Sequence, residues 1–302
     1  MIHSRFPLRG KIGPLLITLV WPASWLQIQP VAEYHFFPLW LGYILTLDAI
    51  VFIRRGTSLF TRSRRTFVFL FVISAPVWWL FELFNRFVVN WIYIGFESTN
   101  PIRYVLFASL AFSTVVPAVF ETTELFASFD WIQRIRHGPI IRPTTLVLSG
   151  SVIFGILSFG AMILFPRYTF PFAWTCVFFI LDPINYVLGW SSITGWVSTG
   201  EWRPVLAIWA GTLMCGFFWE LWNYYAYPKW IYEIPFVEFA HIFEMPLLGY
   251  GGYLTFGLEI FAMYHFINGL IGKQISQQRA TDAVSIIDLN MNVWQSQLNT
   301  TN

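Results

Sequence analysis

The stretch "CGFFWELWNYYAYPKWIYEIPF" (residues 215–236) places a glutamate and an asparagine three residues apart among tryptophans, phenylalanines and tyrosines. The chain does this twice, because residues 78–96 read "WWLFELFNRFVVNWIYIGF". A carboxyl group is costly in such apolar surroundings, so its repetition indicates a repeated structural unit. The residues that align, at a shift of 138, are Glu82 with Glu220 and Asn85 with Asn223.

The composition is that of a membrane protein. Of 302 residues, 56% are hydrophobic and only 11% are charged, whereas a soluble domain carries about 25% charged residues. Apolar runs of roughly 20 residues are long enough to cross a bilayer as helices. We therefore predict an all-α integral membrane protein with about eight transmembrane helices, six or seven being the alternatives. The predicted spans are residues 13–30, 35–53, 66–88, 104–127, 145–165, 168–188, 203–224 and 241–271.

The basic residues predict the orientation of these spans. With the N-terminus inside, only four of the 18 Lys and Arg residues fall in outer segments, namely Arg86, Arg103, Arg167 and Lys229. This asymmetry satisfies the positive-inside rule and predicts that both termini are cytoplasmic, with a bacterial cytoplasmic membrane as the expected location. The net charge of +2 follows from the same asymmetry and does not indicate nucleic-acid binding.

The duplication extends beyond the opening stretch. "YHFFPLWLGYILTLDAI" (34–50) pairs with "YTFPFAWTCVFFILDPI" (168–184), which aligns Asp48 with Asp182. "FSTVVPAVFETTELF" (112–126) pairs with "YGGYLTFGLEIFAMY" (250–264). An even number of spans in each unit returns the chain to its starting side, so the prediction is two parallel four-helix repeats, which tend to form a site where they meet. The predicted parts are residues 1–138 and 139–275, one repeat each, and a polar cytoplasmic tail over 276–302.

Acids inside spans are the candidate functional residues. Intramembrane carboxyl groups are expensive and mark proton pathways or ligand sites; the alternative is that they only join helices by hydrogen bonds. An amide one helical turn away can hold such a carboxyl in one orientation. The residues predicted for proton chemistry are Glu82, Glu220, Glu121 and Glu259, and those predicted to bind the ligand are Asn85, Asn223, Trp79, Trp219, Trp222, His241 and Glu244.

The aromatic residues near the acids have two interpretations. Tryptophans beside the acids can line a pocket for a flat or polyene ligand and stabilise a cation through their ring faces, whereas the Trp-x-Tyr pairs resemble anchors at the membrane surface. His241 and Glu244 lie one helical turn apart, but no wider set of ligands has the spacing of a metal site, so no metal or cofactor is predicted. The Trp-x-Tyr residues are Trp91, Tyr93, Trp230 and Tyr232.

Four stretches carry a family resemblance. "FELFNRFVVNWIY" (81–93) with "VVPAVFETTELF" (115–126), and "WELWNYYAYPKWIY" (219–232) with "YLTFGLEIFAMY" (253–264), resemble the heterodimeric-type lycopene cyclase domains of bacteria and fungi, within a wider group of bacterial multi-span membrane proteins. The chain differs from that family in having Glu where it has Asp, and single glutamates where it has a pair. The resemblance implies a paired multi-span fold and cofactor-independent cyclisation of a carotenoid-type lipid.

Three functions follow as alternatives. The first is a lycopene-cyclase-like isomerase that starts its reaction by donating a proton from a shielded carboxyl group to an isoprenoid or carotenoid-type lipid. The second is a proton-coupled transporter or lipid carrier. The third is a non-catalytic membrane scaffold in which the acids join helices. The sequence does not predict the oligomeric state.

Overall fold

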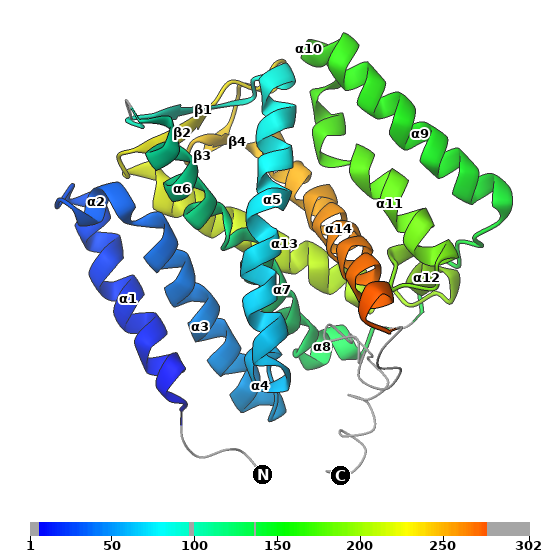
Figure 1. Cartoon of the computed structure of the whole chain (residues 1–302), viewed down its shortest axis with the longest axis horizontal. Coiled ribbons are helices and arrows are strands. Elements are labelled where there is room, and N and C mark those ends of the chain that lie inside the picture. Colours follow the sequence, from blue (N-terminus) through cyan, green and yellow to red (C-terminus); the bar gives the residue numbers. More distant parts are fainter. Residues whose placement is uncertain (1–5, 97–99, 136, 277–302) are drawn as a thin grey trace.

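The computed structural model describes residues 6–96, 100–135 and 137–276. It is a mainly helical bundle in which α1 and α3 stand on one side, α9 and α11 on the other, and α5, α7, α13 and α14 lie between them (Figure 1). The predicted tail, apart from Ser276, falls outside these residues and stays a prediction. The main helices are α1 (Leu8–Trp25), α3 (Phe36–Arg55), α5 (Arg64–Val88), α6 (Pro101–Phe112), α7 (Val115–Ala127), α9 (Thr145–Leu164), α11 (Cys176–Val187), α13 (Arg203–Tyr224) and α14 (Gly251–Ser276).

Short elements connect the main helices. Two antiparallel ribbons add strands that the all-α prediction did not include: β1 pairs with β2, and β3 pairs with β4. The short elements are α2 (Val31–Tyr34), α4 (Leu59–Arg62), β1 (Trp91–Ile94), α8 (Asp130–Gln133), α10 (Pro166–Thr169), η1 (Phe170–Trp174), α12 (Ile193–Ser198), β2 (Lys229–Tyr232), β3 (His241–Ile242), β4 (Met245–Pro246) and η2 (Leu247–Tyr250).

Seven helical segments of the described chain, not eight, are long and apolar enough to cross a membrane. The predicted first span (13–30) is the exception: the helix there is α1, which carries Arg9 and Lys11 in its first turn and Pro22 near its end. These residues lower its apolarity. The seven spans are Phe36–Arg55, Arg64–Val88, Pro101–Ala127, Thr145–Leu164, Pro166–Val187, Arg203–Tyr224 and Leu247–Gly272.

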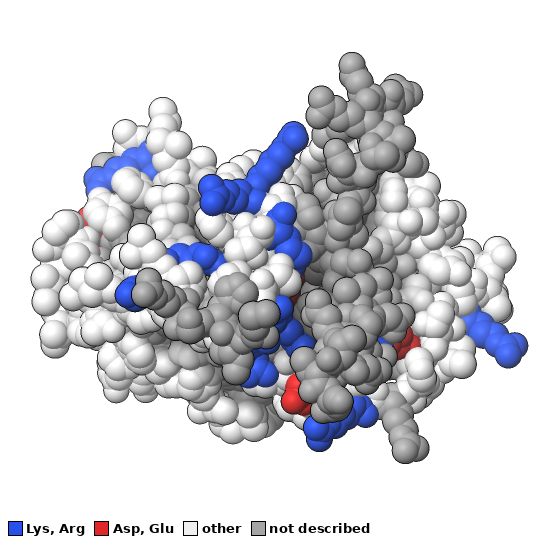
Figure 2. All heavy atoms as spheres, turned by 90° about the horizontal axis from the view of Figure 1, so that it is seen from below, with Lys and Arg blue, Asp and Glu red and all other residues white. Residues whose placement is uncertain are grey.

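One end of the bundle is basic. The chain enters α5 and α13 at this end through Arg64 and Arg203, and it leaves α3 there through Arg54 and Arg55. Figure 2 shows the face at this end, over which Lys and Arg side chains gather. The bundle therefore has a basic face at the end where α5 and α13 begin and α3 ends.

Two predicted spans are broken helices, and a buried polar side chain satisfies the backbone at each break. Between α6 and α7, the Ser74 hydroxyl donates to the Phe112 carbonyl (2.5 Å) and accepts from the Val116 amide (3.0 Å). At the start of α11, the Glu259 carboxylate accepts from the Val177 amide (2.8 Å). Unpaired backbone groups are expensive in a membrane, so these side chains permit the breaks.

Helix α1 packs closely on α3 through glycines. A Cβ atom added at Gly42 would lie 2.8 Å from the Gly13 carbonyl oxygen, so the two backbones leave no room for a side chain there. Small residues commonly permit such close approach between membrane helices.

Replacing Gly42 with leucine should therefore push α1 away from α3 and lower stability by about 1–3 kcal/mol, the usual cost of overpacking. The measurement is thermal unfolding of the purified protein in detergent. Gly150→Leu is the matched control, because an added Cβ at Gly150 meets no atom within 4 Å. Equal stability of the two variants would show that the α1–α3 contact is not tight.

Candidate functional site

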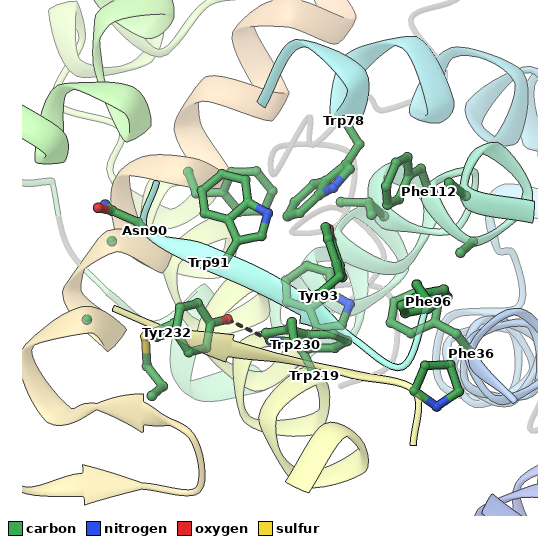
Figure 3. A pocket seen from close by; sticks show the side chains of 18 of the residues that line it. Phe36, Trp78, Asn90, Trp91, Tyr93, Phe96, Phe112, Trp219, Trp230 and Tyr232 are labelled. Atoms are coloured by element: carbon green, nitrogen blue, oxygen red, sulfur yellow. Dashed lines mark hydrogen bonds between the residues drawn. The ribbon is translucent and has the colours of Figure 1, made fainter. Parts of the chain in front are cut away.

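A cavity of about 620 Å³ lies where residues of both predicted repeats meet, and aromatic rings line most of it. This volume is within the usual range for small-molecule sites. Figure 3 shows the rings of Trp78, Trp91, Tyr93 and Trp219 turned toward this space from α5, β1 and α13. The other aromatic and histidine side chains of the lining are Tyr34, His35, Phe36, Phe37, Phe96, Tyr104, Phe107, Phe112, Phe170, Trp174, Trp230, Tyr232, Tyr253 and Phe256.

The cavity reaches the surface of the protein, because several of its lining residues are exposed. On α6, the lining residues Phe107 and Leu110 are 42% and 45% exposed, and on η2, the lining residue Leu248 is 59% exposed. Deeper in the wall, Phe256 is 1% exposed. The space therefore runs from the outside of the helical bundle to its core.

The strand pair β1–β2 forms part of the wall. Trp91 lies opposite Tyr232, and Tyr93 lies opposite Trp230. All four residues line the cavity, so the Trp-x-Tyr pairs, which the sequence also allowed as membrane-surface anchors, are wall residues here. Sequence reasoning missed this pairing because the two strands lie far apart in the chain.

Glu82 stands behind this wall and accepts hydrogen bonds from three of its residues. The donors to its Oε1 are the Tyr93 hydroxyl (2.6 Å), Trp78 Nε1 (2.9 Å) and Trp91 Nε1 (3.2 Å). The carboxylate thereby fixes the orientation of three rings that face the cavity. Glu82 itself is half-buried and is not a lining residue.

Glu220 occupies the corresponding place on α13 and is fully buried. Its Oε1 accepts from the Tyr232 hydroxyl (2.7 Å) and the Tyr253 hydroxyl (2.8 Å). Trp230 Nε1 donates in turn to the Tyr232 oxygen (2.9 Å). Its second oxygen, Oε2, has no hydrogen-bond partner among the described residues. Glu220 is thus linked to the cavity through two tyrosine hydroxyls.

The tyrosines of the two strands remain protonated. Burial, and next the charge of Glu220, raises the pKa of Tyr232 well above its usual value. Burial and the charge of Glu82 do the same for the pKa of Tyr93. Both side chains therefore present an O–H group to their carboxylates at neutral pH.

Asn85 and Asn223 bind strand backbone and do not line the cavity. Asn223 donates from Nδ2 to the Trp230 carbonyl (2.7 Å) and accepts at Oδ1 from the Trp230 amide (2.9 Å). Asn85 donates to the Trp91 carbonyl (2.7 Å) and accepts from the Asn90 amide (2.8 Å). The Glu-x-x-Asn pair therefore holds a strand in place: the asparagine amide hydrogen-bonds to the strand backbone, and the glutamate carboxyl accepts from the strand's tyrosine.

The acids Glu121 and Glu259 lie outside the lining. Glu259 holds the first turn of α11, as described above. Glu121 is fully buried on α7, beside Asp48 and Glu124, and its two oxygens accept no hydrogen bond from a donor in the described chain. Both nearby acids form ion pairs with arginines, Asp48 with Arg9 and Glu124 with Arg62. These residues form a separate polar cluster.

The residues predicted to bind the ligand divide into two groups. Trp219 lines the cavity, but Trp222 packs beside Trp40 and Tyr43, and Trp79 donates to the Ser109 hydroxyl (2.9 Å) outside it. His241 and Glu244 lie on the β3–β4 hairpin and are not lining residues, although the neighbouring Met245 is. His241 Nε2 lies 3.2 Å from Glu238 Oε2, and Glu244 forms an ion pair with Lys229.

Sequence reasoning missed several wall residues, notably His35, Trp174, Tyr253 and Phe256. Tyr253 donates to Glu220 although it lies 33 residues from it, and no pattern in the sequence links the two. A usable signal existed only for Tyr93 and Tyr232, which follow their glutamates at nearly equal distances in the two predicted repeats.

The comparisons with known proteins find no relative. No family model matches the chain, and no curated protein or solved structure is significantly similar to it. Within the described residues, no group of three or more His, Cys, Asp or Glu side chains is arranged to hold a metal ion. The geometry of the cavity therefore carries the functional argument.

Proposed function

We propose that this protein binds an isoprenoid or carotenoid-type lipid in the aromatic cavity and rearranges it by acid–base chemistry, without a cofactor, as a lycopene-cyclase-like isomerase would. One observation carries the proposal: the donors to the buried Glu220 carboxyl are two tyrosine hydroxyls that line the cavity. A carboxyl group shielded from water but linked to a ligand site suits general acid catalysis.

The lining supports an extended apolar ligand. Its rings present apolar surface from both predicted repeats, with few polar atoms between them. The ring of Trp219 stacks on that of Tyr253 (5.8 Å between centroids), and the ring of Phe81, behind the wall, stacks on that of Trp174 (5.4 Å). Such packing preorganises ring faces that attract a cation. A lipid can reach them from the bilayer where Phe107, Leu110 and Leu248 are exposed.

The proposed reaction is a balanced isomerisation. In the reacting form, Glu220 is protonated and donates to the Tyr232 oxygen, so that the Tyr232 hydroxyl turns toward the ligand. Glu220 passes its proton to the Tyr232 oxygen, and the Tyr232 hydroxyl passes its own proton to one carbon of an alkene, whose π electrons form the new C–H bond. The neighbouring carbon becomes a cation, which the aromatic faces stabilise. Glu82, through Tyr93, then takes a proton from an adjacent carbon and a double bond re-forms. Substrate and product have the same atoms, but the step leaves Glu220 one proton short and Glu82 with one proton more. Release of a proton from Glu82 to water and uptake of a proton from water by Glu220 restore the starting state before the next turnover.

We further propose that the fold consists of two repeats of the same orientation, with the basic end cytoplasmic. Matching contacts support this. Asp48 accepts from the Phe60 amide (3.0 Å), and Asp182 accepts from the Thr194 amide (2.8 Å), the residue that aligns with Phe60. The register of β1 with β2 also pairs each Trp with the Tyr of the other strand, as a two-fold axis between them requires. The seven apolar spans alone would leave the two termini on opposite sides of the membrane. The proposal therefore takes α1, which packs along α3, as an eighth crossing, and both termini are then cytoplasmic.

A second candidate function is proton-coupled transport. The observation that favours it is a cluster of three buried acids, Asp48, Glu121 and Glu124. Two of them form ion pairs with partly exposed arginines, Asp48 with Arg9 and Glu124 with Arg62. Intramembrane acids of this kind form the proton relays of transporters. If this is the function, the wild type takes up its substrate with protons in proteoliposomes, and Glu121→Gln abolishes this uptake. The wild type then converts no lipid.

The decisive experiment is conversion of a linear carotenoid by the purified protein in lipid nanodiscs. Replacing Glu220 with glutamine should lower the rate by roughly 100-fold or more, the usual contribution of a general acid, and Tyr232→Phe should also lower it strongly. Glu233→Gln is the matched control, because Glu233 is an exposed acid outside the lining. Full turnover by the Glu220→Gln variant would refute the assignment.

A further inference from the structure

His35 is a buried histidine in the wall of the cavity that the proposed reaction does not use. It lies between α2 and α3, is 5% exposed and belongs to the lining. Its Nδ1 lies 2.9 Å from the Ala32 carbonyl oxygen. Within the described residues, the imidazole ring forms no other hydrogen bond. The second ring nitrogen, Nε2, therefore has no partner there.

The chemistry of the ring decides what Nε2 can do. A carbonyl oxygen only accepts hydrogen bonds, so Nδ1 carries the hydrogen. Burial lowers the pKa of His35 below its usual value and outweighs the hydrogen bond to Ala32, so the ring is neutral at neutral pH. A neutral imidazole has one N–H group, which leaves Nε2 as an acceptor. A partner for Nε2 must therefore donate a hydrogen bond.

The neighbouring polar groups satisfy one another. At the opening beside α2 and α6, Glu33 accepts from the Tyr34 hydroxyl (2.8 Å) and from Arg103 Nη2 (2.8 Å). Glu33 and Tyr34 line the cavity there, as do the exposed residues Phe107 and Leu110. The opening thus has a polar rim, where His35 Nε2 has no hydrogen-bond donor, and an aromatic interior.

We propose that His35 Nε2 accepts a hydrogen bond from a hydroxyl group at one end of the bound lipid. The ligand is then an isoprenoid-type alcohol, with its hydroxyl end at the α2–α6 opening and its apolar chain among the aromatic rings. This inference rests on the proposed binding of an isoprenoid in the cavity, and it adds the polar end group and its position. A ligand that covers Nε2 without donating a hydrogen bond leaves this acceptor unpaired, which costs affinity.

The test compares two probes that differ in one hydrogen-bond donor: a linear isoprenoid alcohol and its methyl ether. Both probes are fluorescent polyenes, so binding is measured as energy transfer from the protein's tryptophans to the bound probe. The wild type should bind the alcohol roughly tenfold more tightly than the ether, as expected for one buried hydrogen bond. His35→Phe should bind both with the weaker affinity, whereas His35→Gln, which keeps an acceptor, should restore part of the preference.

His137→Ala serves as the control, since His137 is exposed and outside the lining, and it should keep the wild-type preference. Equal affinity of the wild type for alcohol and ether would overturn the assignment of the hydroxyl while leaving isoprenoid binding intact. An unchanged preference in His35→Phe would also overturn it. Failure of both probes to bind to the wild type would instead refute the proposed function.

Discussion

Replacing Asp48 with alanine is expected to lower the free energy of unfolding by about 3–5 kcal/mol, because it leaves a charge without its buried partner. Asp48 is fully buried, pairs with Arg9 of α1, and accepts from the Phe60 amide (3.0 Å) at the start of α4. One carboxylate therefore joins α1, α3 and α4. Its loss leaves the Arg9 guanidinium without its counter-ion and the Phe60 amide without its acceptor.

The measurement is reversible unfolding of the purified protein in mixed micelles. The matched control is Glu33→Ala, which removes an acid from the half-exposed pair with Arg103. Exposed ion pairs contribute little because water screens them and their side chains lose entropy, so this variant should unfold like the wild type. A small effect of Asp48→Ala would mean that Arg9 reaches water without cost and that the pair does not hold α1.

Replacing Asn223 with leucine is the second large effect that we expect. The variant loses the donor and the acceptor that hold the Trp230 carbonyl and amide. Asn223 is 1% exposed, so both backbone groups lose their partner in a buried setting. Each unpaired group costs about 1–3 kcal/mol. The β1–β2 ribbon should also loosen, which would open the wall of the cavity at Trp230 and Tyr232.

Two readouts separate these effects. Unfolding in mixed micelles reports the loss of stability, and hydrogen exchange of the backbone amides of residues 229–232 reports the loosening of the ribbon. Asn85→Leu removes the corresponding grip on β1, but Asn85 is half-buried, so water can replace part of what it loses and the cost should be smaller. Protected amides in β2 of Asn223→Leu would show that the ribbon does not depend on this side chain.

The Glu-x-x-Asn pairs illustrate how far the sequence leads toward the site. Their repetition drew attention to Glu82 and Glu220, because an acid inside an apolar run is visible without any structure. Their partners were not visible. Glu220 faces Tyr253 and Tyr232 only because α14 and β2 return to the same place as α13. The asparagines, predicted to bind the ligand, hold strand backbone for the same reason.

The broken helices show the same limit within a single span. Residues 104–127 and 168–188 are apolar enough to be predicted as continuous helices. Whether such a helix can break depends on whether another part of the chain offers a polar group at the break, as Ser74 and Glu259 do. The span predicted at 241–271 does not begin as a helix, because its first residues form the β3–β4 hairpin and a 3-10 turn. Pro246 disfavours a helix there, and Met245 pairs with Ile242.

The sequence by itself determined three things: that the chain is an integral membrane protein, at which residues most of its spans begin and end, and which acids lie inside these spans. These properties are local, because hydropathy and charge are read over a stretch no longer than one bilayer crossing. Only the tertiary structure decided that two strands far apart in the chain pair into one wall, that aromatic rings from both predicted repeats enclose a cavity, and that His35 and Tyr253 reach it. Those features arise from contacts between distant segments, so no single stretch of the sequence contains them.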